Sequence, residues 1–527
     1  MAGSIDEKGP SSLTGFKIMF KKMTVPLFFA WIITALLNIM FGYDTTSFGG
    51  VQSIPAFERE FGTPTGEDGA YVLSPARASY MSSLAFVGKF LGALLGSVFI
   101  EPLGHRISIW IVCLISFVGI IIECTATTVA QFVVGRIIVY YSVGFAEMCA
   151  TTYQSEIVPA SMRGAVVGSI QLFNQIGQIT AAGVNRRYSR TVAPEGWIVP
   201  VGVQAICPVI VAVGIFFIPD GPRWLISKGR DQDAVKTLER VRPKKDVAAG
   251  HCTAEIEAIR VAVENPEKGP WMDLFRGTNL RRTSIATVIY IFQQFTGQAF
   301  VSNYSPRFYQ SVGLGEHAFD YNIASATVGW VGVACGMPFI DIAGRRLVLM
   351  IGCTGQAIFL FIVAGVGLPA EPNRHEANML VASVILYNFF YAGTIASISY
   401  VIGAEIGSYA LREKTQAFAL SISIIAAFVT AFSIPYVIAE IDANIGWVFG
   451  GFATMATIYT YFCVPETKGR SLEEVDELFE RRIPARKFAS TRTSGAGRRV
   501  AELESDIAGL GTKKGASTGV EYHDDKV

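Results

Sequence analysis

Stretches of about twenty apolar residues recur along this chain, and they restrict its possible folds more than any other feature. A helix of about 20 residues crosses a hydrocarbon core roughly 30 Å thick. Because lipid tolerates only helices and closed barrels as spanning structures, the sequence predicts an all-α membrane protein. The expected spans fall into two groups of six, beginning near Thr24, Ser79, Ser108, Thr128, Ala165 and Trp197, and then near Thr283, Asp320, Leu347, Asn378, Thr415 and Ile445.

The composition supports a polytopic membrane protein and argues against several other classes. Of 527 residues, 51% are hydrophobic and only 17% are charged, whereas soluble domains carry about 25% charged residues. A net charge of +1 gives no indication of a nucleic-acid partner. The eight cysteines and five histidines are dispersed without metal-ligand or nucleophile spacing, and no phosphate-binding GxxxxGK[ST] loop is present. We therefore expect neither an enzyme nor an ATP-driven pump, and no cofactor or metal.

The polar segments divide the chain into five parts. The central segment contains DQDAVKTLERV and AEIEAIRVAVE, whose spacing predicts amphipathic helices. The last part is rich in Ser, Thr, Gly and charge, which is typical of disorder. The predicted parts are a cytoplasmic N-terminal tail (1–22), a six-helix half (23–218), a cytoplasmic helical linker (219–282), a second six-helix half (283–465) and a largely disordered cytoplasmic tail (466–527).

The distribution of Lys and Arg predicts the orientation in the membrane. The N-terminal tail, the central linker, the turn at Arg345–Arg346 and the segment after the last span all carry basic residues. An even number of spans places all of them on one side, so both termini are expected in the cytoplasm. Arg186, Arg187 and Arg190, between the fifth and sixth spans, run against this bias.

Three short motifs occur once in each half, in the same order and at a nearly constant offset. EPLGHR follows the second span, and DIAGRR follows the eighth. EIVPASMRG follows the fourth span, and EIGSYALRE follows the tenth. PDGPR follows the sixth span, and PETKGR follows the twelfth. Three matched pairs at one offset indicate that the chain is a duplicated six-helix unit. In membrane transporters that are built from two repeats of this kind, the two halves rock around a central binding site.

Each repeated motif places an acid and a base at the cytoplasmic end of a helix. These groups can be surface ion pairs of little energetic weight. Alternatively, they form a network that holds the two halves together in one conformation and opens in the other. We favour this cytoplasmic gate, because the acids recur at matched positions. Its predicted members are Glu101, Arg106, Glu156, Arg163, Arg223, Asp341, Arg345, Arg346, Glu405, Arg412 and Glu466.

An aspartate, Asp44, directly follows the apolar part of the first span. A carboxylate at membrane depth is costly unless it is paired. Arg136 lies about eight residues into the fourth span, roughly 12 Å from its outer end at 1.5 Å per residue. The two charges are therefore expected at similar depth, and we predict that they form an ion pair rather than facing water separately.

Two further ionisable residues fall within spans. Lys89 lies near the middle of the second span, and Glu147 lies three turns after Arg136 on the same helix face. We expect each to be a snorkelling or locally paired group that faces the interior of the bundle, rather than a direct contact of the substrate. A lysine in a central cavity either neutralises Asp44 or Glu147 or binds an anionic substrate.

Side-chain amides gather in one span of each half. Gln171 and Gln178, with Asn174 and Gln175 between them, lie in the fifth span, and the seventh span contains QQFTGQAFVSNY. Amides donate and accept hydrogen bonds at once, which suits sugar hydroxyls, although amides also join helices within membranes. The density in two corresponding spans favours a central binding site. The predicted substrate-binding residues are Gln171, Gln178, Gln293, Gln294, Gln298, Asn303 and Tyr400.

The motifs EPLGHR, DIAGRR, PDGPRWL, QQFTG and PETKGRSLEEVDELF together resemble the sugar-porter branch of the major facilitator superfamily, particularly its fungal members. The resemblance covers about residues 20–482 and implies the major facilitator fold with 12 transmembrane helices. It also implies that Asp44 and Arg136 are the proton-coupling pair of a symporter, and that Tyr304 belongs to an outer gate. Gln171, Gln178, Gln293 and Gln294 match sugar-contacting positions of that family.

Several positions depart from the hexose-porter pattern. Ala299 replaces an asparagine, Ala396-Ser397 with Tyr400 replaces a Gly-Pro…Trp pattern, and Ser423 stands at an amide position. The predicted function is transport of a sugar (hexose, pentose or oligosaccharide) by proton-coupled symport with alternating access. The alternatives are a polyol, a quinate-like acid or another metabolite as substrate, an uncoupled sugar uniporter, an exporter, or a sensor. We expect a monomer in the plasma membrane whose partners are the substrate, protons and lipid.

Overall fold

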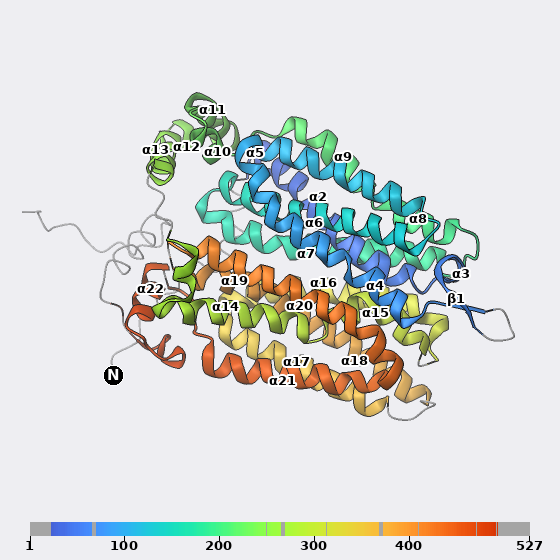
Figure 1. The fold of residues 1–527 in the computed structure, drawn as a ribbon. Helices are drawn as coiled ribbons and strands as arrows, with labels where there is room; N and C mark the ends of the chain where they lie inside the picture. The colour runs from blue at the N-terminus through green and yellow to red at the C-terminus, as the bar shows by residue number, and fades with distance from the viewer. Residues whose placement is uncertain are drawn as a thin grey trace, which may run out of the picture.

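A computed structural model describes residues 23–493 apart from 66–69, 249, 265–268, 312, 368–372, 409, 471 and 492. The predicted N-terminal tail and most of the predicted disordered tail lie outside this range. The chain forms two helical bundles that lie side by side, with the N-terminal bundle at the top of Figure 1 and the C-terminal bundle below it. The all-α fold agrees with the prediction from the apolar stretches.

The first bundle contains the helices before the linker. A two-stranded antiparallel hairpin, not expected from the sequence, lies at one end of it and pairs Thr63 with Val72. The elements are α2 (Val25–Val51), α3 (Pro55–Phe61), β1 (Thr63–Thr65), β2 (Ala70–Val72), α4 (Pro75–Ser83), α5 (Ala85–Cys124), α6 (Val129–Ile157), α7 (Ala160–Tyr188), α8 (Glu195–Val203), α9 (Ile206–Gly214) and η1 (Ile215–Phe217).

The polar linker folds into short helices, as its spacing predicts, and they lie beside one end of the first bundle in Figure 1. Thr24, which caps α2, donates its hydroxyl to the Val241 carbonyl at 2.8 Å and ties the linker to the first span. The linker elements are α10 (Pro222–Ser227), α11 (Asp231–Val241), α12 (Lys244–Ala248), α13 (His251–Glu264) and η2 (Trp271–Phe275). We call this end of the molecule the linker end, and the end with the hairpin the distal end.

The second bundle repeats the arrangement of the first. Asn373 begins one of its helices with a reciprocal capping box, in which Glu376 accepts from the Asn373 backbone at 2.7 Å. The elements are α14 (Gly277–Phe295), α15 (Gln298–Ser311), η3 (Gly315–His317), α16 (Ala318–Ala343), α17 (Arg345–Val366), α18 (Arg374–Gly393), α19 (Ile395–Ile406), α20 (Arg412–Ile441), η4 (Asp442–Asn444), α21 (Ile445–Cys463), α22 (Leu472–Glu480) and η5 (Ala485–Lys487).

The glycines of the repeated EPLGHR and DIAGRR motifs explain why those motifs recur. Gly104 has φ 79° and Gly344 has φ 96°, both in the left-handed region that favours glycine. Gly104 interrupts α5 and so divides it into the second and third spans. Gly344 makes the corresponding turn between α16 and α17. The sequence repeat is therefore a repeated tight turn at the linker end.

Among the described residues, nine segments are long and apolar enough to cross a membrane by length and composition. One of them contains both α20 and α21, which the turn at Asp442–Asn444 separates. The other two expected spans are α7 and the pair α14–α15, whose amide-rich sequences reduce their apolar content. The helices thus account for the twelve predicted spans.

The two bundles are joined by polar contacts at the distal end. Ser79 donates to the Phe432 carbonyl at 2.6 Å, and Gln52 donates to the Asn303 carbonyl at 2.5 Å. Arg186 pairs with Asp320 at 2.5 Å, so an arginine that runs against the basic-residue bias has a partner in the other half. These contacts hold the distal end of the interface closed.

Candidate functional site

A polar cavity lies between the two bundles, about halfway along them. It is lined by all seven residues predicted to bind substrate: Gln171, Gln178, Gln293, Gln294, Gln298, Asn303 and Tyr400. Asn174, Gln175 and Asn388 add three more amides, and Thr45, Ser302 and Ser423 add hydroxyls. Helices of both halves thus supply a dense set of groups that donate and accept hydrogen bonds.

Breaks in the helices explain how the second bundle brings these groups to one place. Gly297, with φ 102°, separates α14 from α15, and Gln293, Gln294 and Gln298 flank it. Thr394 separates α18 from α19, two residues before the cavity residue Ala396. Discontinuous helices near the middle of the membrane are a recurring way of building transporter sites, because they expose side chains and backbone groups to a cavity.

Hydrogen bonds orient the cavity amides. Gln294 donates to the Ser423 hydroxyl at 3.1 Å, so the serine that stands at an amide position of hexose porters contacts an amide. Gln178 donates to the Asn174 side chain at 2.9 Å. Gln293 donates to the Ala396 carbonyl at 3.2 Å, across the break in the tenth span. These contacts hold the amides in place while leaving acceptor or donor atoms for a ligand.

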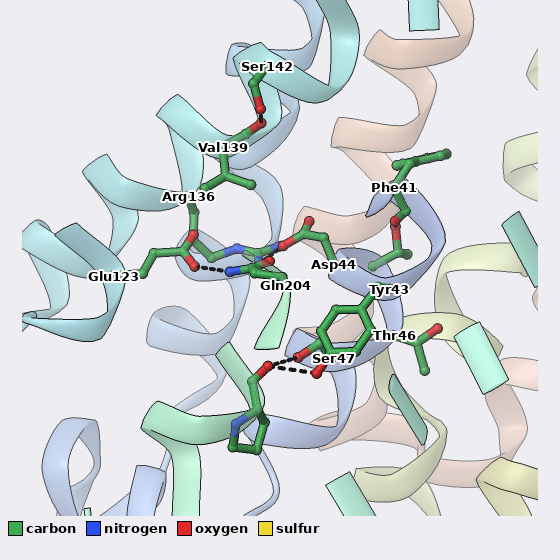
Figure 2. Close-up of polar contacts among 12 residues, drawn as sticks. Phe41, Tyr43, Asp44, Thr46, Ser47, Glu123, Arg136, Val139, Ser142 and Gln204 are labelled. Carbon is green, nitrogen blue, oxygen red and sulfur yellow. Dashed lines mark hydrogen bonds and ion pairs between the residues drawn. The ribbon is translucent and has the colours of Figure 1, made fainter. Parts of the chain in front are cut away.

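Asp44 and Arg136 form a buried ion pair, as predicted. Arg136 Nη1 lies 3.2 Å from Asp44 Oδ1, and the two side chains are 3% and 1% exposed (Figure 2). The guanidinium also lies over the rings of Phe48, at 4.1 Å, and Tyr140, at 4.8 Å. Asp44 directly precedes Thr45, which lines the cavity. The buried charge pair is therefore adjacent in sequence to a residue of the candidate binding site.

A second buried carboxylate near Arg136 was not foreseen from the sequence. Glu123, in α5, is 1% exposed and accepts from Gln204 Nε2 at 2.8 Å (Figure 2). Glu123 packs against Gly135, the residue before Arg136. Gln204 lies in the break between α8 and α9, so its side chain can turn inward. An acid at the penultimate residue of a helix resembles an ordinary helix terminus, and only the packing of α5 on α6 reveals that it is buried.

Contacts beside the ion pair lock the first span to the sixth. Tyr43 and Ser47, on either side of Asp44, both donate to the carbonyl of Pro200, at 2.8 and 3.3 Å (Figure 2). This carbonyl is available because α8 ends at Val203, so the backbone N–H of Gln204 bonds to the Gly202 carbonyl rather than to the Pro200 carbonyl. The arrangement fixes the position of Asp44 relative to α8.

Lys89 and Glu147 pair with each other, which agrees with the expectation that each has a local partner. Lys89 Nζ lies 3.0 Å from Glu147 Oε2. Tyr400, from the other half, donates its hydroxyl to Glu147 Oε1 at 3.3 Å. Lys89 also lies over the ring of Phe41, 4.0 Å from its centroid. This polar contact therefore links the two halves near the cavity.

The predicted gate residues pair within their own halves at the linker end. In the second half, Arg345 contacts Asp341 at 3.2 Å and Glu405 at 2.9 Å. Glu466 accepts from the backbone N–H groups of Arg345 and Arg346, at 3.0 and 3.1 Å. The acids of the repeated motifs thus meet the basic residues of other motifs in the same bundle.

The corresponding groups of the first half are arranged around the turn after the sixth span. Glu156 lies 3.8 Å from His105, and Arg106 lies 4.0 Å from Asp220. Glu101 accepts through its carbonyl from the Trp224 ring, next to Arg223. The side chain of Arg163 lies outside the described residues. The prediction that these groups bridge the two halves in another conformation stays a prediction.

Arg412 and Tyr304 occupy contrasting positions at the two ends. Nε and Nη2 of Arg412 are buried without a hydrogen-bond partner among the described residues. Tyr304, predicted as part of an outer gate, is fully buried and donates to the Ala431 carbonyl at 3.0 Å. It lies in the closed distal part of the interface, on the α15 side.

Comparison with known proteins identifies relatives that extend over most of the chain. The general alpha-glucoside permease of Saccharomyces cerevisiae is 29% identical over 476 residues, covering 87% of this chain and 76% of the permease. The high-affinity glucose transporter ght2 of Schizosaccharomyces pombe is 30% identical over 468 residues, covering 85% of this chain and 86% of that protein. The major facilitator-type transporter ecdD of Aspergillus rugulosus is 28% identical over 502 residues, covering 91% and 92%.

Solved structures with the same fold confirm the predicted architecture. The proton:xylose symporter XylE bound to 6-bromo-6-deoxy-D-glucose superposes with a TM-score of 0.71 at 23% identity, covering 86% of this chain and 99% of XylE. XylE of E. coli in an inward open conformation gives a TM-score of 0.69, covering 85% and 98%. At this identity the likeness shows the major facilitator fold.

The sequence profile of the family described as "Sugar (and other) transporter" matches residues 30–479, which includes most of the first span and all of the later ones. The match agrees with the twelve spans, the duplicated motifs and the polar cavity between the halves. The chain is therefore a multi-pass membrane transporter rather than an enzyme; it has the major facilitator fold and belongs to the sugar (and other) transporter family.

Proposed function

We propose that this protein carries a sugar across the membrane together with a proton, by alternating access. The observation that carries the proposal is the buried Asp44–Arg136 pair together with a cavity that is lined by amides from both halves and by Thr45, the residue after Asp44. The amides supply the donors and acceptors that sugar hydroxyls require. Relatives that include a glucose transporter and an alpha-glucoside permease support the sugar as substrate class.

Proton coupling follows from the chemistry of the ion pair. Protonation of Asp44 removes its negative charge and weakens its attraction to Arg136. The guanidinium then has Glu123 as a second carboxylate nearby, as well as the rings of Phe48 and Tyr140. The positive charge therefore does not become isolated when the proton binds. A similar fold in a proton:xylose symporter supports this role.

Alternating access is supported by the uneven distribution of contacts between the halves. Polar contacts close the interface at the distal end, while the acid–base groups at the linker end pair inside each bundle. In the opposite conformation, the buried guanidinium atoms of Arg412 that have no hydrogen-bond partner in the described part of the chain gain one across the linker end. On this proposal the linker end is cytoplasmic, both termini are cytoplasmic, and the protein functions as a monomer in the plasma membrane.

Uptake into liposomes tests the function. Purified protein is reconstituted, and the uptake of labelled hexoses, pentoses, disaccharides and polyols is measured with and without an inward proton gradient. We expect at least one neutral sugar to accumulate above its external concentration only when the gradient is present. Equilibration of the sugar to the same level with and without the gradient would contradict proton coupling.

Replacing Gln294 by Ala should weaken substrate binding. The amide lines the cavity and is oriented by Ser423, and a neutral hydrogen bond contributes about 0.5–1.5 kcal/mol. The half-saturation concentration of the transported sugar should therefore rise about 2- to 10-fold. Gln232→Ala, on the exposed face of the linker helix α11, is the matched control and should behave as the unmodified protein. An unchanged half-saturation in Gln294→Ala would place the binding site elsewhere.

A further inference from the structure

We propose that the central cavity accepts a sugar acid, that is, a polyhydroxylated monocarboxylate whose carboxylate binds Lys89 while its hydroxyls bind the amides. This inference rests on the proposed function, because it names a substrate class for the same site. The lining of the cavity is the first observation in its support. Among the described residues that line it, Lys89 is the single charged residue, and no carboxylate is present. A polyhydroxy anion matches this combination of one cation and many amides.

The position of Lys89 leaves it able to bind a ligand. Its side chain is 8% exposed, and its ammonium carries three N–H donors. Glu147 takes one of them at 3.0 Å, and the Phe41 ring shields a second side of the ammonium at 4.0 Å. Lys89 lines the cavity and Glu147 is not among its lining residues. The N–H groups of the ammonium that Glu147 does not take are therefore available to a ligand in the cavity.

Glu147 has a second partner that stabilises it when the ligand shares Lys89. The Tyr400 hydroxyl donates to its other carboxylate oxygen at 3.3 Å, from the opposite half. Tyr290 packs edge-on against Tyr400, with ring centroids 5.6 Å apart, and holds that hydroxyl in place. Glu147 therefore competes with the carboxylate of the ligand for the ammonium of Lys89. The groups around Glu147 are Lys89 on α5, Tyr400 on α19 and Tyr290 on α14.

The two possible ligand classes gain differently from this arrangement. A neutral sugar accepts a hydrogen bond from the ammonium but brings no opposite charge. A carboxylate accepts the same hydrogen bond and adds the attraction of opposite charges, which is stronger inside a protein than in water. The cavity therefore discriminates in favour of the acid over the otherwise identical sugar.

Matched pairs of ligands test the proposal in the same liposomes. D-Glucose is compared with D-glucuronate, and D-galactose with D-galacturonate, since each pair differs only at the terminal carbon. Labelled uptake is measured for each compound alone, and half-saturation is measured for those transported. We expect at least one of the two acids to be taken up, with a lower half-saturation than its neutral counterpart.

Variants at the ion pair connect that preference to Lys89. In Lys89→Gln, the ratio of acid uptake to neutral-sugar uptake should fall about 10-fold or more, the loss expected for a charged hydrogen bond. Lys89→Arg keeps the charge and should retain most of the ratio. Glu147→Gln removes the competing carboxylate and should lower the half-saturation for the acid. Lys236→Gln, on the exposed surface of α11, removes the same charge elsewhere and should leave the ratio unaltered.

The outcomes separate this proposal from the proposed function. Accumulation of a neutral sugar without uptake of either acid overturns the sugar-acid proposal and leaves proton-coupled sugar transport standing. Uptake of an acid with an unchanged ratio in Lys89→Gln overturns the role of Lys89. Uptake of none of the four compounds, by protein that remains monodisperse, contradicts both proposals for these ligands.

Discussion

Replacing Asp44 by Asn is expected to abolish the uphill accumulation of substrate while preserving exchange of substrate across the membrane. The amide keeps the shape of the side chain and an oxygen for Arg136 Nη1, now at 3.2 Å from the carboxylate, but it cannot take up a proton. Without a titrating group, the proton gradient no longer drives transport. Accumulation in liposomes should therefore fall to equilibration, whereas counterflow exchange should continue at a measurable rate.

The exchange assay also controls for folding, because removing one partner of a buried ion pair generally costs about 3–5 kcal/mol. This cost is reduced because the rings of Phe48 and Tyr140 and the nearby carboxylate of Glu123 still stabilise the charge of the Arg136 guanidinium. Asp233→Asn, which removes a carboxylate from an ion pair on the exposed linker helix, is the matched control and should accumulate substrate normally. If Asp44→Asn still accumulated substrate against a gradient, Asp44 would have no role in coupling.

Gly177→Ala should strongly destabilise the first half, by roughly 3 kcal/mol. A Cβ atom at position 177 would lie 2.1 Å from the Ile39 carbonyl oxygen and 2.7 Å from the Tyr43 nitrogen, both in the backbone of α2. Close helix contacts in membranes depend on such small residues. Since backbone cannot move aside as a flexible side chain can, α2 must shift away from α7, and Asp44 shifts with it. We expect a lower melting temperature in detergent and reduced transport.

A second glycine of the same helix supplies the control. A Cβ atom at Gly183 would meet nothing within 4 Å, so Gly183→Ala tests the same substitution without a clash. It should leave the melting temperature unchanged or raise it, because alanine favours helix by about 0.5–1 kcal/mol over glycine. Equal melting temperatures for Gly177→Ala and Gly183→Ala would show that the contact between α2 and α7 adjusts freely.

Much of the candidate site was predictable because charge is costly in a membrane. The cost of an isolated charge at that depth was enough to predict that Asp44 pairs with Arg136, and the structure places their atoms 3.2 Å apart. The same argument predicted local partners for Lys89 and Glu147, which contact each other at 3.0 Å. The density of amides in the fifth and seventh spans predicted a shared polar cavity, which the two bundles form between them.

Other features could not be read from a linear sequence, since they depend on which helix faces meet. Glu123 is buried because α5 packs on α6, and Gln204 reaches it because the sixth span breaks at that residue. The contact of Tyr400 with Glu147 joins side chains of different halves, which are 253 residues apart in the sequence. None of these pairs shares a motif or a helical spacing that would indicate contact.

The amino-acid sequence alone determined the class of the protein, the number of spans and the duplication. A span needs a certain apolar length, lipid excludes unpaired charge, and the repeated turns need glycine at Gly104 and Gly344. Each of these requirements concerns a short segment of the chain, so the local sequence shows it. The tertiary structure decided which end of the interface is closed and which groups face the cavity. Those outcomes arise from contacts between distant helices, such as Ser79 with Phe432, whose free energy depends on how the two bundles pack together.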